Sequence, residues 1–284
     1  MSSRTCSAVS ALGVGVAAAV AGLLPWLITG MRLQHGQPVM LLPLDRYYLN
    51  AVFGILAMPG GIVGVVLRHQ LHSGWRRRSF GPVLCGVFGV LVVQVVACVQ
   101  AMMVLIPSLR AGGSPPHLIA IGSTLVIAVL VGMGIALAIA RSSRGAATIA
   151  AVGAALGIGS WISAFQSLNP DAASRLPQLA ELTGVLATAV PAAVTGIALA
   201  WCGWRPVRRL GAWIGALVIL WAGGAILNGL FAAASSRADS SDFAAMTTQG
   251  LHSLSASLLS GWIALLAALA VGVIGSSVRS VARD

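Results

Sequence analysis

Three side-chain amides lie inside long apolar stretches of the chain, and they are its clearest candidates for polar chemistry. Gln94 lies near the middle of one stretch, Gln100 lies nearer the end of the same stretch, and Asn228 lies in a later one. A side-chain amide offers hydrogen-bond donors and an acceptor, so such residues can bind an uncharged polar group. They can equally join neighbouring membrane helices, where one hydrogen bond contributes about 0.6 kcal/mol on average. Because an amide in lipid would lack partners, we expect Gln94 and Asn228 to face the bundle interior.

Two prolines add to this set, since Pro59 and Pro191 each lie in the middle of an apolar stretch. Proline lacks the backbone N–H and clashes with the preceding turn, so it kinks or breaks a helix. Interrupted helices at matching positions of two halves mark substrate sites in some transporters, although an ordinary kink is the alternative. The predicted substrate-binding residues are therefore Gln94, Gln100, Asn228, Pro59 and Pro191.

The chain offers little for catalysis or metal binding. His69 and His72 have the spacing of two metal ligands on a helix, but no cysteine or carboxylate accompanies them. A site built from His117, His252 and nearby acidic residues is a weaker alternative. No serine-hydrolase, phosphate-loop or zinc-protease motif is present. We therefore expect no enzymatic activity, no cofactor and no metal.

The most charged stretch is residues 67–80, which holds four arginines between two apolar runs. Arginines next to a membrane span keep the segment that contains them on the cytoplasmic side. We expect this stretch to be a cytoplasmic anchor, and Arg76, Arg77 and Arg78 to be a candidate docking site for a partner subunit. Nucleic-acid binding is not expected, because the segment is short and no basic domain surrounds it.

Composition defines the class of protein. Of 284 residues, 58% are hydrophobic and only 8% are charged, whereas soluble domains carry about 25% charged residues. So few charges cannot cover a surface in water, so the solvent of this chain is largely lipid. All 17 basic residues are arginine, which, with the abundant alanine and glycine, indicates a GC-rich bacterial genome.

Eight stretches approach the roughly 20 apolar residues that a helix needs to cross a membrane. They are residues 8–31, 50–67, 81–107, 118–140, 145–167, 179–202, 210–233 and 253–276. The first is too long for a signal peptide, so we expect it to be retained. We therefore predict an all-α, polytopic transmembrane helix bundle.

Charge sets the expected orientation of this bundle. The segments on one side, counted from the N-terminus, hold 12 of the 17 arginines, and those on the other side hold five arginines and all but one of the acidic residues. Positive charge stays inside, so both termini are expected in the cytoplasm and the protein in the bacterial inner membrane.

An internal duplication is the last prediction from the pattern. An offset of 132 residues places Pro59 on Pro191 and Gly64 on Gly196, and an offset of about 135 places Gly22 on Gly157. Chance matches are common in a chain of this composition, so an unduplicated bundle is the alternative. We predict two four-span halves, residues 1–140 and 141–284, in the same orientation.

The segment between the first two spans has its own pattern. Residues 40–44 are apolar, and Tyr47 and Tyr48 follow them. Tyrosine favours the membrane interface, so we expect this segment to lie on or dip into the outer leaflet and to cap the bundle.

For function, the sequence favours a transport or permease-type protein for a small or amphipathic substrate. A structural or assembly subunit of a membrane complex fits the lack of buried charge equally well, and a membrane-embedded enzyme fits less well. No charge lies near the middle of a span, which argues against a proton-driven antiporter or an ion pump. The expected partners are the lipid bilayer and a cytoplasmic or membrane subunit.

Overall fold

The computed structural model describes residues 3–30, 40–44, 48–73, 80–110, 115–168, 175–204, 207–235 and 243–281, which form helices and no strand. Eight of its helical segments are long and apolar enough to cross a membrane. The prediction of an all-helical chain with eight such segments is therefore confirmed.

The first four spans are single helices, apart from one π-helical turn. They are α1 (Ser3–Pro25) with η1 (Trp26–Gly30), α2 (Leu49–Ser73), α3 (Gly81–Arg110) and α4 (Pro115–Arg141). The fifth and sixth spans are α5 (Arg144–Ser167) and α7 (Pro177–Cys202). The last two are built from pieces, which are η4 (Val207–Arg209), α8 (Leu210–Val218), η5 (Ile219–Gly223) and α9 (Gly224–Ala234), then α10 (Phe243–Ser260) and α11 (Trp262–Val281).

The eighth span begins at Phe243, well before residue 253, where the sequence placed it. Polar residues in its first turns lower the hydropathy and hid this start. Their hydroxyl groups bond back onto the helix: Thr247 Oγ1 donates to the Phe243 carbonyl at 2.9 Å, and Thr248 Oγ1 to the Ala244 carbonyl at 2.8 Å. The helix therefore satisfies these groups internally.

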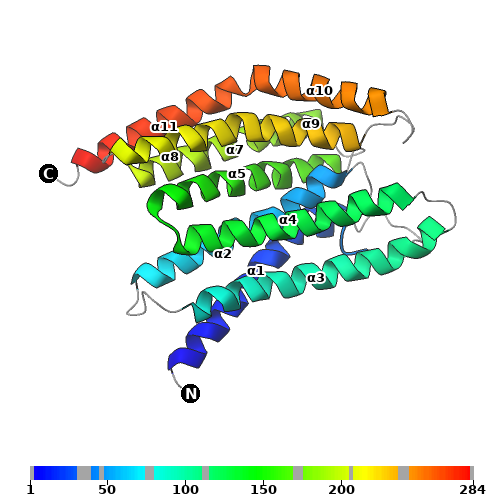
Figure 1. Cartoon of the computed structure of the whole chain (residues 1–284), viewed down its shortest axis with the longest axis horizontal. Helices are drawn as coiled ribbons and strands as arrows, with labels where there is room; N and C mark the ends of the chain where they lie inside the picture. The colour runs from blue at the N-terminus through cyan, green and yellow to red at the C-terminus, as the bar shows by residue number, and fades with distance from the viewer. Residues whose placement is uncertain are drawn as a thin grey trace.

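Successive spans run in opposite directions, so the bundle has two ends, and α1 begins on the side where α11 finishes (Figure 1). We call the end that holds residues 40–44 and the start of α2 the loop end. We call the other end, with Arg68, Arg141, Arg144 and Arg209, the arginine end. These are the ends that the charge pattern assigned to the outer and cytoplasmic sides.

Helix α2 is the centre of the first half. Of its span, 78% is buried, against 44% or less in each of the others, because α1, α3, α4 and α5 all pack on it. Small residues permit this close packing. At Gly60 the two backbones come so close that an added Cβ would lie 2.0 Å from the Gly132 carbonyl oxygen of α4.

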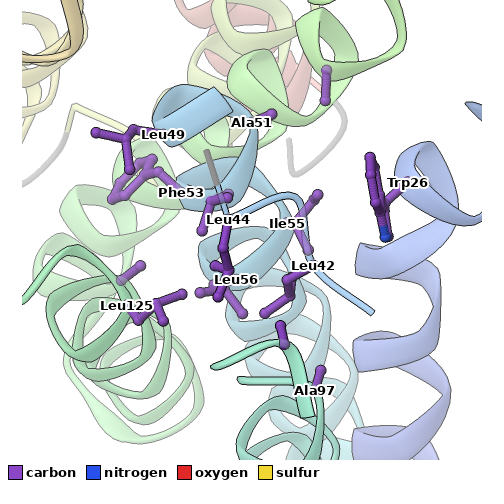
Figure 2. Packing of buried hydrophobic residues seen from close by; sticks show 14 of the residues in the cluster. Trp26, Leu42, Leu44, Leu49, Ala51, Phe53, Ile55, Leu56, Ala97 and Leu125 are labelled. Carbon is purple, nitrogen blue, oxygen red and sulfur yellow. The ribbon is translucent and has the colours of Figure 1, made fainter. Parts of the chain in front are cut away.

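The loop end is closed by residues 40–44. Leu42 and Leu44 are buried, and they lie with Ile55 and Leu56 of α2 and Ala97 of α3 in one apolar cluster (Figure 2). These residues therefore cap the bundle at this end, as expected, while their position in the outer leaflet stays a prediction. Tyr47 lies outside the described residues.

The two halves repeat one packing pattern. In the first half, α1 packs on α2 and α3, and α2 packs on α4; in the second half, α5 packs on α7 and α8, and α7 packs on α11. An added Cβ on Gly64 would lie 2.8 Å from the Ile139 Cβ, and one on Gly196 would lie 2.6 Å from the Val271 Cβ. Both residues of the second contact lie 132 positions after those of the first.

The halves lie side by side and meet where α5 packs along α2. If a twofold axis related the two halves, α1 would pack along α7 as α5 packs along α2. Instead, α2 and α5 lie between α1 and α7 (Figure 1), and within the described residues α1 does not pack along α7. Helices α1 and α3 therefore form one outer side of the bundle, and the second half forms the opposite side.

Candidate functional site

A pocket of about 240 Å³ lies at the loop end between α2, α9 and α10. We call it the α9–α10 pocket. Helix α9 packs mainly on α10 and only lightly on α2, which leaves this space between them. The residues that line it are Leu49, Asn50, Asn228, Phe231, Ala232, Ser235, Ser253 and Ser257.

The described residues of the lining include polar side chains but none that is charged. Asn228 Nδ2 donates to Ser257 Oγ at 3.2 Å, and the Ser253 hydroxyl donates to the Asn228 carbonyl at 3.4 Å. Asn50 and Ser235 bring a further amide and hydroxyl to the same space. Amides and hydroxyls both donate and accept, so the pocket can bind an uncharged polar group such as another hydroxyl or amide.

Asn228 is thus placed in this pocket and not in the bundle interior, where the sequence placed it. Its side chain is exposed, because α10 lies at the edge of the fold and packs chiefly on α9. Asn50, Ser235 and Ser253 were not among the predicted binding residues. One sequence pattern could have indicated this site, since residues 253–260 are rich in serine, which is unusual for a lipid-facing helix.

Both spans that frame the pocket are interrupted at the same level. The seventh contains the π-helical turn η5, and the eighth is broken between Ser260 and Trp262. The interruptions touch, since Trp221 Nε1 donates to the Leu258 carbonyl at 3.0 Å and an added Cβ on Gly261 would lie 3.0 Å from the Trp221 ring. Such π-helical turns often occur at functional sites.

Gln94 faces the bundle interior, as predicted, and contacts the backbone of α2. Its side chain is 4% exposed, and Nε2 donates to the Leu56 carbonyl at 2.7 Å. Its Oε1 is buried and has no hydrogen-bond partner among the described residues. The same holds for the hydroxyl of Thr195, which is fully buried in α7. Whether Gln94 binds a substrate stays a prediction.

Neither proline breaks its helix, contrary to one expectation, since α2 and α7 continue as α-helices through Pro59 and Pro191. Pro59 supplies no N–H to the Ile55 carbonyl, four residues earlier. A glycine of the neighbouring helix covers this carbonyl: an added Cβ on Gly22 would lie 2.5 Å from the Ile55 oxygen and 2.6 Å from the Pro59 ring.

The second half repeats this contact. An added Cβ on Gly159 would lie 2.8 Å from the Ala187 carbonyl oxygen and 2.9 Å from the Pro191 ring. Ala187 is again four residues before the proline. The contacts therefore pair Gly22 with Gly159, whereas the sequence offset paired it with Gly157.

Gln100 holds the loop that closes the bundle. Its Oε1 accepts a hydrogen bond from the Leu41 N–H at 2.8 Å, and Trp26 Nε1 donates to the Met40 carbonyl at 2.7 Å. Both bonds satisfy backbone groups of a loop that is buried without a regular helix or strand. This role was not predicted, because Gln100 was expected to bind a substrate or to join a neighbouring helix.

Arg68 joins three helices at the arginine end. Its Nη1 donates to the Ile139 carbonyl at 2.5 Å and to the Ser142 carbonyl at 3.1 Å, at the close of α4. Its guanidinium lies 4.6 Å from the ring centroid of Trp201 in α7, and that of Arg144 lies 5.8 Å from the same ring. Arginine is attracted to the face of an indole ring. This cluster connects the two halves.

The five predicted binding residues therefore do not form one site. Gln94 of α3 bonds to Leu56, three residues before Pro59 on α2, while Gln100 lies at the loop end, Asn228 in the α9–α10 pocket and Pro191 within the second half. The predicted docking residues Arg76, Arg77 and Arg78 lie outside the described residues. Among the described residues, no group of histidine, cysteine and acidic side chains could hold a metal ion.

Comparison of the chain with models of protein families, with curated proteins and with solved structures found no match. The fold defines the chain as an all-helical protein whose eight apolar helices fit a membrane protein. Its function is therefore argued from its own residues.

Proposed function

We propose that the protein is a permease-type protein of the bacterial inner membrane that binds a small uncharged polar or amphipathic substrate in the α9–α10 pocket. The observation that carries this proposal is the lining of the pocket, in which two amides and three hydroxyls surround one space. Leu49, Phe231 and Ala232 add an apolar wall to it. This combination suits a molecule with both hydroxyl and apolar surface.

Charge argues for an uncharged substrate. Among the described residues, none that lines the pocket is ionisable, and a charged molecule would lose its hydration there without an opposite charge to replace it. Hydroxyl and amide groups can exchange their bonds to water for bonds to Asn50, Asn228 and Ser257 at little net cost.

The interruptions provide the movement that transport needs. Helices α9 and α10 pack chiefly on each other. The regular α-helical geometry of the two spans is interrupted at the level of Trp221 and Gly261, where α9 begins and α10 ends. A tilt of this hairpin about that level would widen or narrow the pocket against Leu49 and Asn50. Hinges of this kind absorb the change at a few positions between rigid elements.

The experiment is a swelling assay on proteoliposomes placed in glycerol or glucose and followed by light scattering. We expect faster solute entry than in protein-free liposomes, and Asn228→Leu should remove most of the gain. The matched control is Gln249→Leu, an exposed amide on α10 outside the pocket lining, which should leave entry unchanged. Equal rates with and without protein, for both solutes, would refute an unassisted permease.

The same proposal includes the orientation of the chain, with both termini in the cytoplasm, and the duplication of a four-span unit. Arg68, Arg141, Arg144 and Arg209 gather at one end of the bundle, which the charge pattern assigns to the cytoplasm, and the positive-inside rule supports both termini on that side. In a background without the native cysteines, Ser73→Cys should resist an impermeant thiol reagent in intact cells. Labelling without permeabilisation would reverse the orientation.

The repeated glycine–proline contacts and the constant offset between α2–α4 and α7–α11 support two duplicated four-span halves. Two halves in the same orientation follow from an even number of spans in each. If the halves descend from one unit, Gly22→Ala and Gly159→Ala should lower the midpoint of thermal unfolding by similar amounts, because each pushes on a proline ring and a carbonyl oxygen. An effect at one glycine alone would contradict the equivalence.

A second candidate is an assembly subunit of a membrane complex. It is favoured by the exposed face of small residues on α7, which includes Ala189 and Ala193, because small residues are enriched where membrane helices associate. Co-purification of a stoichiometric second protein after mild detergent extraction, together with no solute entry in the swelling assay, would select this function.

A further inference from the structure

The joint between the two halves is a close contact of small residues on α2 and α5. An added Cβ on Gly54 would lie 2.4 Å from the Trp161 backbone nitrogen, and one on Gly61 would lie 2.5 Å from the Ala154 Cβ. An added Cβ on Gly157 would lie 3.3 Å from the Ala57 Cβ. The α2 side of the joint is therefore formed by residues 54, 57 and 61, which are all buried.

Within the part of the chain that the structure describes, no helix packs on the equivalent face of the second half. The offset of 132 that relates α2 to α7 carries residues 54, 57 and 61 onto Leu186, Ala189 and Ala193. All three are exposed, Leu186 by 40%. The same face is thus covered by α5 in one half and uncovered in the other.

The counterpart of the covering helix is uncovered as well. The glycine–proline contacts equate Gly22 of α1 with Gly159 of α5, so the α5 residues 154, 157 and 161 correspond to Ala17, Val20 and Leu24. These three residues of α1 are also exposed. One molecule therefore carries an uncovered equivalent of each of the two faces that form the joint, and these faces lie on opposite outer sides of the bundle.

We propose that a second copy of this chain places its α1 on the exposed face of α7, formed by Leu186, Ala189 and Ala193, and so repeats the α2–α5 joint between molecules. The proposal goes beyond the permease function and depends only on the equivalence of the two halves. Because different faces meet, the interface is head-to-tail, and such interfaces build rings or longer rows.

Orientation and chemistry agree with this occupant. Helices α1 and α5 both begin at the arginine end, so a copy docked in this way would have the same orientation in the membrane. The six residues of the two faces carry no charge or polar side chain, so the contact forms within the apolar layer. Leu186 stands where the α2–α5 joint has Gly54, and Val20 where it has Gly157, so the helices would lie farther apart than α2 and α5 do.

The experiment is disulfide cross-linking in native membranes, in a background without the native cysteines. Ala17→Cys and Ala193→Cys correspond to the contact of Ala154 with Gly61. Two differently tagged single variants, co-expressed, should form a mixed disulfide dimer on oxidation. The double variant should give a ladder of dimers and larger products.

The matched control replaces Ala17 with Ile127, which is 57% exposed on α4. The pair Ile127→Cys and Ala193→Cys should cross-link several-fold less, because the equivalent of α4 takes no part in the joint. Each single variant alone should give little dimer, since like faces do not meet.

A second measurement keeps the test independent of the cysteine variants. Native mass spectrometry of the wild-type chain released from membrane nanodiscs should show oligomers, and Ala193→Phe should shift them to monomer. A monomeric wild-type chain, equal cross-linking of the control pair, or strong self-cross-linking of Ala17→Cys alone would overturn the head-to-tail proposal.

Discussion

Replacing Gly60 with alanine is expected to destabilise the bundle more than any other single methyl group added to α2. The new Cβ would lie 2.0 Å from the Gly132 carbonyl oxygen, 2.7 Å from its carbonyl carbon and 3.0 Å from its Cα. All three atoms belong to the backbone of α4, so no side-chain rotation can relieve the contact. The two helices must separate.

The size of this effect follows from the required separation. Ordinary van der Waals contact begins near 3.4 Å, so α2 and α4 must move apart by more than one ångström at the crossing. A gap of 0.5–1 Å already forfeits about a quarter to a half of a dispersion contact, and overpacking costs about 1–3 kcal/mol. Alanine also favours a helix over glycine by about 0.5–1 kcal/mol, which offsets part of the cost.

The assay is thermal unfolding followed by the fluorescence of the eight tryptophans, in one detergent and at one protein concentration. Gly134→Ala on α4 is the control, because an added Cβ there meets nothing within 4 Å, and it carries the same gain in helix propensity. We expect a lower unfolding midpoint for Gly60→Ala and an unchanged or higher one for Gly134→Ala. Equal midpoints would refute the close α2–α4 crossing.

Substitutions at three further positions, Gln94, Thr195 and Trp201, are tested by the same unfolding assay. Gln94→Leu should change stability by less than about 1 kcal/mol, because the lost hydrogen bond is modest. Gln94→Glu should cost several kcal/mol, because it buries an unpaired carboxylate. Similar unfolding midpoints for the two variants would contradict the burial of the Gln94 side chain. Thr195→Val should raise the midpoint, because it removes a hydroxyl whose burial without a partner costs about 1–3 kcal/mol, and a fall would mean that the hydroxyl is bonded. Trp201→Leu should cost about 1–2 kcal/mol through the lost contacts with Arg68, while Trp204→Leu, which is 42% exposed, should be near neutral.

Much of the fold could be predicted because lipid imposes one requirement on every residue of a span. Backbone groups without water must bond within their own helix, so hydropathy and length located the eight spans, and the serine pair at residues 142–143 ended α4 and began α5. The prediction failed at the eighth span, since Thr247 and Thr248 satisfy their own hydroxyls and so extend a helix that hydropathy ends.

The candidate site could be predicted only in part. Asn228 was recognisable as a polar residue in an apolar span, but no sequence pattern indicates that it bonds to Ser257 or that Asn50 joins them. The pocket depends on how far α10 stands from the bundle. Hydropathy does not encode that distance, because lipid and protein interior are similarly apolar.

What the sequence by itself determined is the all-helical class of the chain, the number of helices apolar enough to cross a membrane and the asymmetry of its arginines, since each of these depends on local composition. The tertiary structure decided which helix lies at the centre, which carbonyls Gly22 and Gly159 cover, and where Gln100 and Asn228 bond. Those outcomes depend on close packing between segments far apart in sequence. Van der Waals contact decides such packing over fractions of an ångström, which no pattern of residue types records.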